Sequence, residues 1–411
     1  MGMKILHTAD WHLGKKLEQC ERTEEHQHFL NWLIEKLKAE CIDVLIIAGD
    51  IFDTGSPSNT ALELYYRFLR NVKDTCCRDV IIIGGNHDSI STLNAPRELL
   101  KFFNVYIVGG VPDEFTEQII PVKDVSGKLQ VVVCAVPFLR DKDIRLSVPG
   151  ETGAEREARI KQGICDHYNR FKEHIAPYKA EGIPVIATGH LFAAGAGTSD
   201  SEKEIHVGNL GQVCGDQFPE EFDYIALGHI HRPQKVNKMG HIRYSGSPVP
   251  LSFSESDDKK QVIILEFENG AMTRLEEHEI PSCRKLIRVK GSLDAVKSKL
   301  LLLEDVCLQY PSWVEVQVET EAYIPDLEEQ LEKIKVRIPF VERFFCGQVR
   351  KIALPDFAEQ VDEGMTLMDL DPKAVFTKKC EIEFGDNDYS ELMATFEEAM
   401  ERMRQSEEVK E

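Results

Sequence analysis

Five short motifs of aspartate, asparagine and histidine stand at the ends of apolar runs, and their side chains are of the kinds that bind metal ions. Two aspartates, one asparagine and four histidines of the motifs are the candidate ligands, and the motifs contain no cysteine. Oxygen and imidazole ligands of this kind suit hard divalent ions such as Mn²⁺ and Mg²⁺. A single such motif is weak evidence for a metal site, so the prediction depends on the whole set. The motifs are Asp10-Trp11-His12, Gly49-Asp50-Ile51-Phe52-Asp53, Gly84-Gly85-Asn86-His87-Asp88, Gly189-His190 and Gly228-His229-Ile230-His231.

A site that holds two divalent ions side by side indicates an enzyme that hydrolyses phosphoesters. Asp50 stands where a carboxylate shared by both ions is expected. Two ions roughly 3.5 to 4 Å apart activate a water and clamp the phosphate oxygens during in-line displacement. His87 is not needed as a ligand, so it is a candidate proton donor to the leaving oxygen, and Asp53 could hold its ring in the right tautomer. Asp53 and Asp88 could instead only cap the helices that follow them.

The motifs follow predicted strands that at first alternate with amphipathic helices. Strands are expected at residues 4–8, 44–48, 79–84, 131–136, 184–188, 224–227, 242–244 and 262–267, and helices at 23–39, 57–72 and 92–103. This rhythm is typical of a layered α/β domain with a mostly parallel core, and the later strands fit a second sheet packed on the first. Ligands of open α/β sheets gather at the carboxyl ends of the strands, so distant motifs are expected to meet at one edge.

The sequence changes character after Pro281. Residues 282–351 are predicted to form a strand–helix–strand–helix–strand unit, a small α+β domain. They carry 12 Lys+Arg against 11 Asp+Glu, whereas residues 352–411 carry 6 against 17. Asp371-Pro372 is expected to begin a helix in this acidic part. Further on, helical spacing gives an apolar stripe that either docks on a partner or packs back on its own chain. The stripe consists of Tyr389, Leu392, Phe396, Met400 and Met403.

The formal net charge of -21 does not exclude a polyanionic substrate, because part of the acidity belongs to the predicted metal site. A strong basic footprint is lacking, so tight binding of duplex DNA is expected to need another subunit.

No apolar run approaches the roughly 20 residues that span a bilayer, and the N-terminus shows no signal-peptide pattern, which favours a cytoplasmic location. The 11 scattered cysteines are expected to be reduced thiols, and the eight histidines outside the motifs to be structural.

Taken together, the five motifs resemble those of the calcineurin-like metallophosphoesterase superfamily. Their flanking segments resemble the SbcD family of bacterial nuclease subunits, relatives of the archaeal and eukaryotic double-strand-break repair nucleases. Residues 136–140, 189–192, 226–234 and 244–248 carry this closer resemblance. It implies a four-layer metallophosphoesterase sandwich, with two packed sheets flanked by helices, over residues 1–281. A small α+β capping domain over 282–351 and a C-terminal helical partner-binding segment over 352–411 would follow.

The resemblance also implies a role for each motif residue. One ion would be bound by Asp10, His12, Asp50 and His231, and the second by Asp50, Asn86, His190 and His229. The implied ions are Mn²⁺, with Mg²⁺ as the alternative, and His87 would be the proton donor. One position departs from the archaeal and eukaryotic pattern, since Asp53 stands where those relatives have histidine.

The implied reaction is cleavage of DNA phosphodiesters, as a 3'-5' exonuclease on duplex ends and an endonuclease on single strands and hairpins, in DNA repair, recombination and replication. The implied partners are DNA and an SbcC-type coiled-coil ATPase, with two copies of the chain in a heterotetramer and no membrane. Candidate DNA contacts are Arg284, Lys285, Arg288 and Lys290, although a charged strand face can equally be only solvated; the stripe from Tyr389 to Met403 would dock the ATPase.

Two other functions stay open. The same metal motifs serve phosphatases of small molecules or phosphoproteins, because the fold does not encode the leaving group. A scaffold that has lost its metals and only binds partners is the second alternative. The complete set of ligands, with His87 beside them, argues against a scaffold.

Overall fold

The computed structural model describes residues 2–144, 151–193, 214–320 and 323–350, with single residues and short pieces between 373 and 396. The chain forms two compact units, Met1–Arg350 and Lys351–Glu411. This division does not separate residues 282–350 from those before them, and the three-part organisation stays a prediction.

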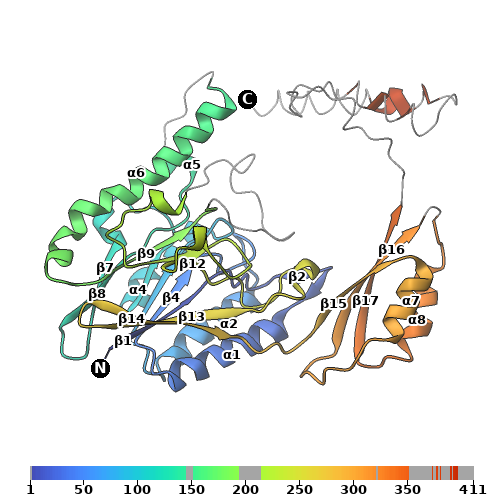
Figure 1. The fold of residues 1–411 in the computed structure, drawn as a ribbon, viewed down its shortest axis with the longest axis horizontal. Coiled ribbons are helices and arrows are strands. Elements are labelled where there is room, and N and C mark those ends of the chain that lie inside the picture. The colour runs from blue at the N-terminus through green and yellow to red at the C-terminus, as the bar shows by residue number, and fades with distance from the viewer. Residues whose placement is uncertain are drawn as a thin grey trace. The chain divides into compact units, whose positions relative to one another are not determined.

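Two six-stranded sheets form the body of the first unit (Figure 1). The first sheet has the order β14-β13-β1-β4-β5-β6, in which β1, β4, β5 and β6 are parallel. The second has the order β11-β12-β10-β9-β8-β7, in which β12, β10, β9 and β8 are parallel. The predicted parallel core and second sheet are therefore confirmed. The strands are β1 (Met3–Thr8), β4 (Val44–Ala48), β5 (Asp79–Ile83), β6 (Val105–Val108), β13 (Gln261–Glu268), β14 (Ala271–Glu279), β7 (Ile119–Lys123), β8 (Leu129–Cys134), β9 (Val185–His190), β10 (Tyr224–Gly228), β11 (Gln234–Lys235) and β12 (Ile242–Tyr244).

Helices cover the outer faces of both sheets, which gives four layers. Alternate residues of the central strands, such as Ile46 and Ile186, enter one core between the sheets. The residues between them enter two further cores, under α1 (Thr23–Ala39) and α2 (Asn59–Val72) on one side and under α6 (Gly153–Ala180) on the other (Figure 1). Because both faces of the strands are buried, their sequences are continuously apolar.

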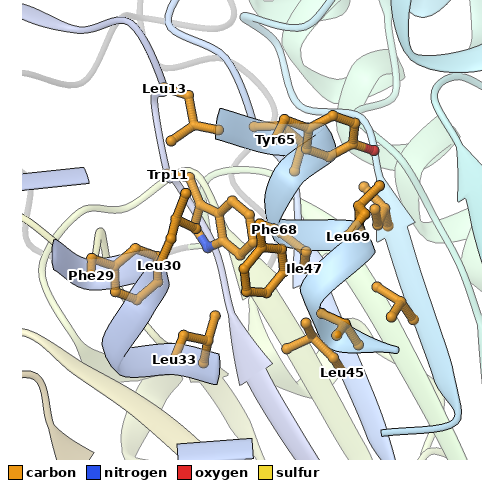
Figure 2. Packing of buried hydrophobic residues seen from close by; sticks show 14 of the residues in the cluster. Trp11, Leu13, Phe29, Leu30, Leu33, Leu45, Ile47, Tyr65, Phe68 and Leu69 are labelled. Carbon is orange, nitrogen blue, oxygen red and sulfur yellow. The ribbon is translucent and has the colours of Figure 1, made fainter. Parts of the chain in front are cut away.

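Trp11 anchors the loop that carries the first motif. Its ring is fully buried and meets Phe29 of α1 and Phe68 of α2 edge to face, with centroids 5.6 and 5.1 Å away (Figure 2). Its indole N–H donates to the Thr8 hydroxyl at 3.1 Å, so the polar end of the ring is also satisfied. The backbone between Asp10 and His12 is therefore fixed by core packing.

Several elements differ from the predicted pattern. The expected helix at 92–103 is two short helices, α3 (Ile90–Asn94) and α4 (Arg97–Lys101), because Pro96 between them lacks an N–H. The 28-residue helix α6 was not predicted; its sequence signal is the capping box formed by Thr152 and Glu155. Short elements complete the body: β2 (Lys16–Leu17), β3 (Cys20–Glu21), α5 (Asp141–Ile144) and the 3-10 helices Phe115–Gln118, Gly215–Gln217, Val236–Lys238 and Phe253–Glu255.

Residues 286–350 follow the predicted order of elements. The strands β15 (Leu286–Gly291), β16 (Ser312–Thr320) and β17 (Val341–Arg350) form a parallel sheet. The helices α7 (Leu293–Leu301) and α8 (Leu327–Lys335) cover one of its faces and share a core with it (Figure 1). A second, small cluster joins this segment to the body through Leu17, Phe253, Leu286 and Trp313.

Little of the second unit is described. Phe376 and Phe396 stack with ring centroids 4.1 Å apart. Phe396 belongs to the predicted stripe, so this part of the stripe packs within its own unit. Leu392 is 44% exposed. Met400, Met403 and Asp371-Pro372 lie outside the described residues. Among the helices that the structure describes, none is long and apolar enough to cross a membrane.

Candidate dimetal site

Loops from both sheets bring the predicted ligands to one edge, beyond the carboxyl ends of the strands. The amides of Asp10 and His12 donate to the carbonyls of Gly49 and Asp50, both at 3.0 Å, which ties the first loop to the second. The amide of His229 donates to Asp10 Oδ1 at 2.8 Å and so ties the two sheets together. Asp10 and His12 follow β1, Asp50 follows β4, Asn86 follows β5, His190 ends β9, and His229 and His231 follow β10.

The four side chains expected around the second ion point at one another. Asn86 Oδ1 lies 2.9 Å from His190 Nε2 and 3.2 Å from His229 Nδ1. Asp50 Oδ2 lies 3.3 Å from the same His190 nitrogen. The other nitrogen of His190, Nδ1, is 3.0 Å from the carbonyl oxygen of Ala48. That contact fixes the ring so that Nε2 faces the cluster.

The side chains expected around the first ion also converge. Asp10, His12 and Asp50 each offer a ligand atom within 4.8 Å of the other two. His12 Nε2 is 3.5 Å from Asp50 Oδ2, so the Asp50 carboxylate reaches both clusters. The His231 ring, only 2% exposed, lies edge to face with His12 at 5.0 Å. All seven predicted ligands thus lie in one constellation, in which Asn86 is partly buried and the other six are buried.

Three atoms of this constellation fit a cation better than any protein partner. Asp10 Oδ2, Asp50 Oδ2 and His12 Nε2 are buried and have no hydrogen-bond partner among the described residues. A buried carboxylate oxygen without a partner is costly, and a cation removes that cost. Hard oxygen and nitrogen donors around the shared Asp50 fit divalent ions. The residues present therefore fit the metal site that the sequence predicts.

Burial and mutual contact shift the ionisation of these groups. Burial raises the pKa of Asp10 to about 7. Although burial acts in the opposite direction, the charge of the neighbouring His190 holds the pKa of Asp50 well below its usual value. Asp50 in turn raises the pKa of His190 to about 9 against the effect of burial. Asp50 and His190 therefore favour each other's charged forms.

The backbone is strained at the ligand residues. Asp10, His12, Asp50 and His229 have φ of 55°, 46°, 50° and 98°, a region that residues other than glycine seldom adopt. Such strain persists only where the surroundings impose it, and it is typical of functional sites. The close approach of the loops also explains a glycine of the motifs, because a β-carbon at Gly85 would collide with the side chain and backbone of Asp50.

Asp53 and His87 are arranged differently from the expected pair. The Asp53 carboxylate lies 3.3 Å from His12 Nδ1 and 3.2 Å from Lys15 Nζ, so it contacts a predicted metal ligand. These contacts lower the pKa of Asp53 to about 2, although burial opposes them. His87 is held by the backbone carbonyl of Asp53, 2.7 Å from its Nδ1. Asp53 therefore positions His87 through its main chain.

Neither aspartate caps a helix. Ser58 caps α2 and Ser89 caps α3. The Asp88 carboxylate instead accepts hydrogen bonds from the amides of Ile51, Phe52 and Gly85 at 2.9 to 3.1 Å. It therefore ties the loop after β4 to the loop after β5.

Two residues next to the site carry no recognisable sequence signal. Glu255 Oε1 lies 3.5 Å from His231 Nδ1 and is fully buried. Lys260 Nζ donates to Glu255 Oε2 at 2.6 Å, and to Ser247 Oγ and the His231 carbonyl at 3.0 Å. His231 and Lys260 hold the pKa of Glu255 well below its usual value against the effect of burial. Because this pair lies outside the five motifs, only the folded chain reveals that it supports His231.

The structure corrects one of the four predicted DNA contacts. Arg284 is 5% exposed and lies 2.5 to 3.0 Å from carboxylate oxygens of Glu24, Glu25 and Glu342. Its guanidinium also stacks over Trp313, 4.5 Å from the ring centroid. It is therefore a buried anchor between residues 286–350 and α1. Lys285 is exposed, while Arg288 and Lys290 pair with Glu315 and Glu319.

Comparison with known proteins agrees with this constellation. The family described as calcineurin-like phosphoesterase matches residues 3–233, and the one described as type 5 capsule protein repressor C-terminal domain, SbcD_C, matches residues 282–384. The SbcD subunit of the nuclease SbcCD from Escherichia coli K12 is 37% identical over 382 residues, 93% of each chain. The same subunit from Bacillus subtilis is 34% identical over 297 residues, 71% of this chain and 73% of its own. The chain therefore belongs to the SbcD family of calcineurin-like metallophosphoesterases.

Proposed function

We propose that this chain is the nuclease subunit of an SbcCD-type complex and that it hydrolyses DNA phosphodiester bonds with two divalent cations, preferably Mn²⁺, in the cytoplasm. The observation that carries the proposal is the meeting of six further ligand side chains around Asp50, with buried carboxylate and imidazole atoms that have no hydrogen-bond partner among the described residues. The relatives are named as subunits of the nuclease SbcCD, which supports DNA as the substrate.

The two cations, when bound, would activate a water and neutralise charge on the phosphate. Asp50 would be shared between them, with Asp10, His12 and His231 on one side and Asn86, His190 and His229 on the other. His87 would supply the proton to the leaving oxygen. Its Nδ1–H donates to the Asp53 carbonyl at 2.7 Å and its amide donates to Asp50 Oδ1 at 2.9 Å, so both its ring and its backbone are fixed relative to the shared ligand.

The partners are part of the same proposal. An SbcC-type ATPase would bind the C-terminal unit through the stripe that includes Tyr389 and Leu392, and DNA would run near the exposed Lys285, with Arg288 and Lys290 beside it. Two copies of the chain would associate through the apolar surface of α2 to α4. Tyr66, Leu99, Phe102 and Phe103 are 40%, 64%, 87% and 46% exposed there, which is unusual for large apolar side chains of a monomer.

Labelled linear duplex and hairpin DNA, incubated with the chain and Mn²⁺ with and without the ATPase and ATP, test this function. We expect cleavage of both substrates that EDTA stops. Hydrolysis of p-nitrophenyl phosphate without cleavage of DNA would favour a phosphatase. Metal binding with neither activity would favour a scaffold.

A further inference from the structure

Cys41 and Cys76 stand at the end of the first sheet that is remote from the metal motifs. Cys41 lies between α1 and β4, and Cys76 lies between α2 and β5. Both connections lead into the amino ends of their strands, whereas Asp50 and Asn86 follow the carboxyl ends. A chemical change at these cysteines would therefore take place one strand length away from the proposed site of phosphodiester hydrolysis.

Both cysteines lie just before paired strands. β4 and β5 are parallel, with Val44 opposite Asp79, and Cys41 and Cys76 each precede these paired residues by three positions. The connections stay side by side before the strands begin. The amide of Arg78 donates to the Asp43 carbonyl at 2.8 Å, and the Arg78 guanidinium pairs with the Asp43 carboxylate at 3.1 Å.

Both thiols are accessible and they contact each other. Cys41 and Cys76 are exposed, as is Cys307 on the segment between α7 and β16, whereas the other cysteines are at least partly buried. A hydrogen bond between the two thiols raises the pKa of Cys76. Disulfides need α-carbons roughly 4.4 to 6.8 Å apart, and the paired strands that these two connections enter lie roughly 4.8 Å apart.

We propose that Cys41 and Cys76 form an intramolecular disulfide when the protein meets a peroxide or a low-molecular-weight disulfide. With hydrogen peroxide, one thiol attacks the peroxide to give a sulfenic acid and water, and the second thiol displaces a second water from that sulfur. Two thiols and one peroxide thus give one disulfide and two waters. With glutathione disulfide, two exchange steps give the same bond and two molecules of glutathione.

The bond would act as a staple of the folded state. It closes the chain from residue 41 to residue 76, which contains α2 and the whole second motif. A cross-link of this kind restricts the unfolded chain more than the folded one and so raises stability. Because the staple lies at the opposite end of β4 and β5 from Asp50 and Asn86, we expect it to leave turnover of a small diester unchanged.

The test is titration of the reduced full-length chain with hydrogen peroxide or glutathione disulfide, followed by alkylation and peptide mapping by mass spectrometry without reduction. We expect one peptide pair that links Cys41 to Cys76 in the wild type and in the matched control Cys307→Ser. The linked pair should be absent from Cys41→Ser and Cys76→Ser. Oxidation should raise the melting temperature of the wild type and of Cys307→Ser, and leave that of the other two variants unchanged.

Several results would overturn the proposal. Cys41 and Cys76 could be recovered separately as sulfinic acids or glutathione adducts, or Cys76 could pair with its neighbour Cys77. A linked peptide found only in a covalent dimer on a non-reducing gel would exclude the intramolecular bond. A melting temperature that falls on oxidation would exclude the staple.

Discussion

The histidines proposed for the two ions are held in different ways. His12 and His231, for the first ion, have their Nδ1 atoms near the carboxylates of Asp53 and Glu255, at 3.3 and 3.5 Å. His190, for the second ion, has its Nδ1 near the neutral carbonyl of Ala48. A carboxylate behind a histidine increases the basicity of the nitrogen that binds metal. The first ion should therefore be the more tightly held.

We expect Glu255→Gln to weaken the binding of one Mn²⁺ about tenfold and to leave the other nearly unchanged, because outer partners of ligands typically contribute 10- to 100-fold to affinity. Isothermal calorimetry of the folded variant measures this directly. Glu276→Gln, on β14, is the matched control and should bind both ions as the wild type does. Equal affinities in all three proteins would contradict the role given to Glu255.

His87→Ala should retain both ions and lose about 10²- to 10⁴-fold in turnover of a generic phosphodiester, since general acid catalysis typically contributes that much. His278→Ala, which changes a histidine of β14, serves as the control. Steady-state rates at saturating Mn²⁺ give the comparison. Turnover by His87→Ala at the wild-type rate would remove His87 from the reaction.

The strands that carry the ligands are the elements best predicted from sequence. β1, β4 and β5 are buried on both faces, so each is an apolar run that ends in a polar motif. The supporting contacts could not be predicted in this way. The Glu255–His231 contact joins residues from different loops. Asp53 contacts His12 through its side chain and His87 through its main chain, and this arrangement depends on the loop conformation at the strained ligand residues.

The contact between the two sheets should make stability sensitive to acid. His7 of β1 is fully buried between the sheets, 3.0 Å from the Tyr224 hydroxyl of β10, and burial lowers its pKa to about 3. Its pKa in the unfolded chain is about 6.5, so below that pH the unfolded state takes up a proton that the folded state does not. The contribution of His7 to the free energy of unfolding is therefore complete above pH 6.5 and falls as the pH falls toward 3.

Between pH 7 and pH 4.5 the loss from His7 alone should be on the order of 2 kcal/mol. Urea unfolding at a series of pH values measures it. His7→Gln should show a shallower pH dependence than the wild type, with a remaining slope from other buried histidines such as His26, whose pKa burial also lowers to about 3. Parallel curves for the two proteins would contradict the assignment.

At the scale of the whole molecule, residues 286–350 are fixed to the body by a buried cluster of charge and aromatic rings. Glu25 Oε1 accepts from Arg22 at 2.8 Å and from Arg284 at 3.0 Å, and both guanidinium groups face Trp313. The resemblance of residues 282–351 to a capping domain suggested a DNA contact at Arg284. Two of its three carboxylate partners, Glu24 and Glu25, lie more than 250 positions away in α1, beyond the reach of pattern analysis.

Arg284→Ala should cost about 3 kcal/mol in the free energy of unfolding, because it removes one of the two guanidinium groups that contact the buried Glu25 carboxylate and the packing over Trp313. Lys285→Ala, next to it and exposed, should leave stability unchanged and weaken DNA binding, with a smaller salt dependence. Chemical unfolding and DNA binding at several salt concentrations separate the two effects. An Arg284→Ala protein of wild-type stability would contradict the anchor.

Asp50 is proposed to be shared by two cations, and the number of Mn²⁺ ions bound per chain, counted by calorimetry and elemental analysis, tests this sharing. The wild type should bind two ions, and His229→Ala should lose mainly the second. Asp50→Asn should lose affinity for both. An Asp50→Asn protein that still binds two ions as tightly as the wild type, or a wild type that binds one, would contradict the account.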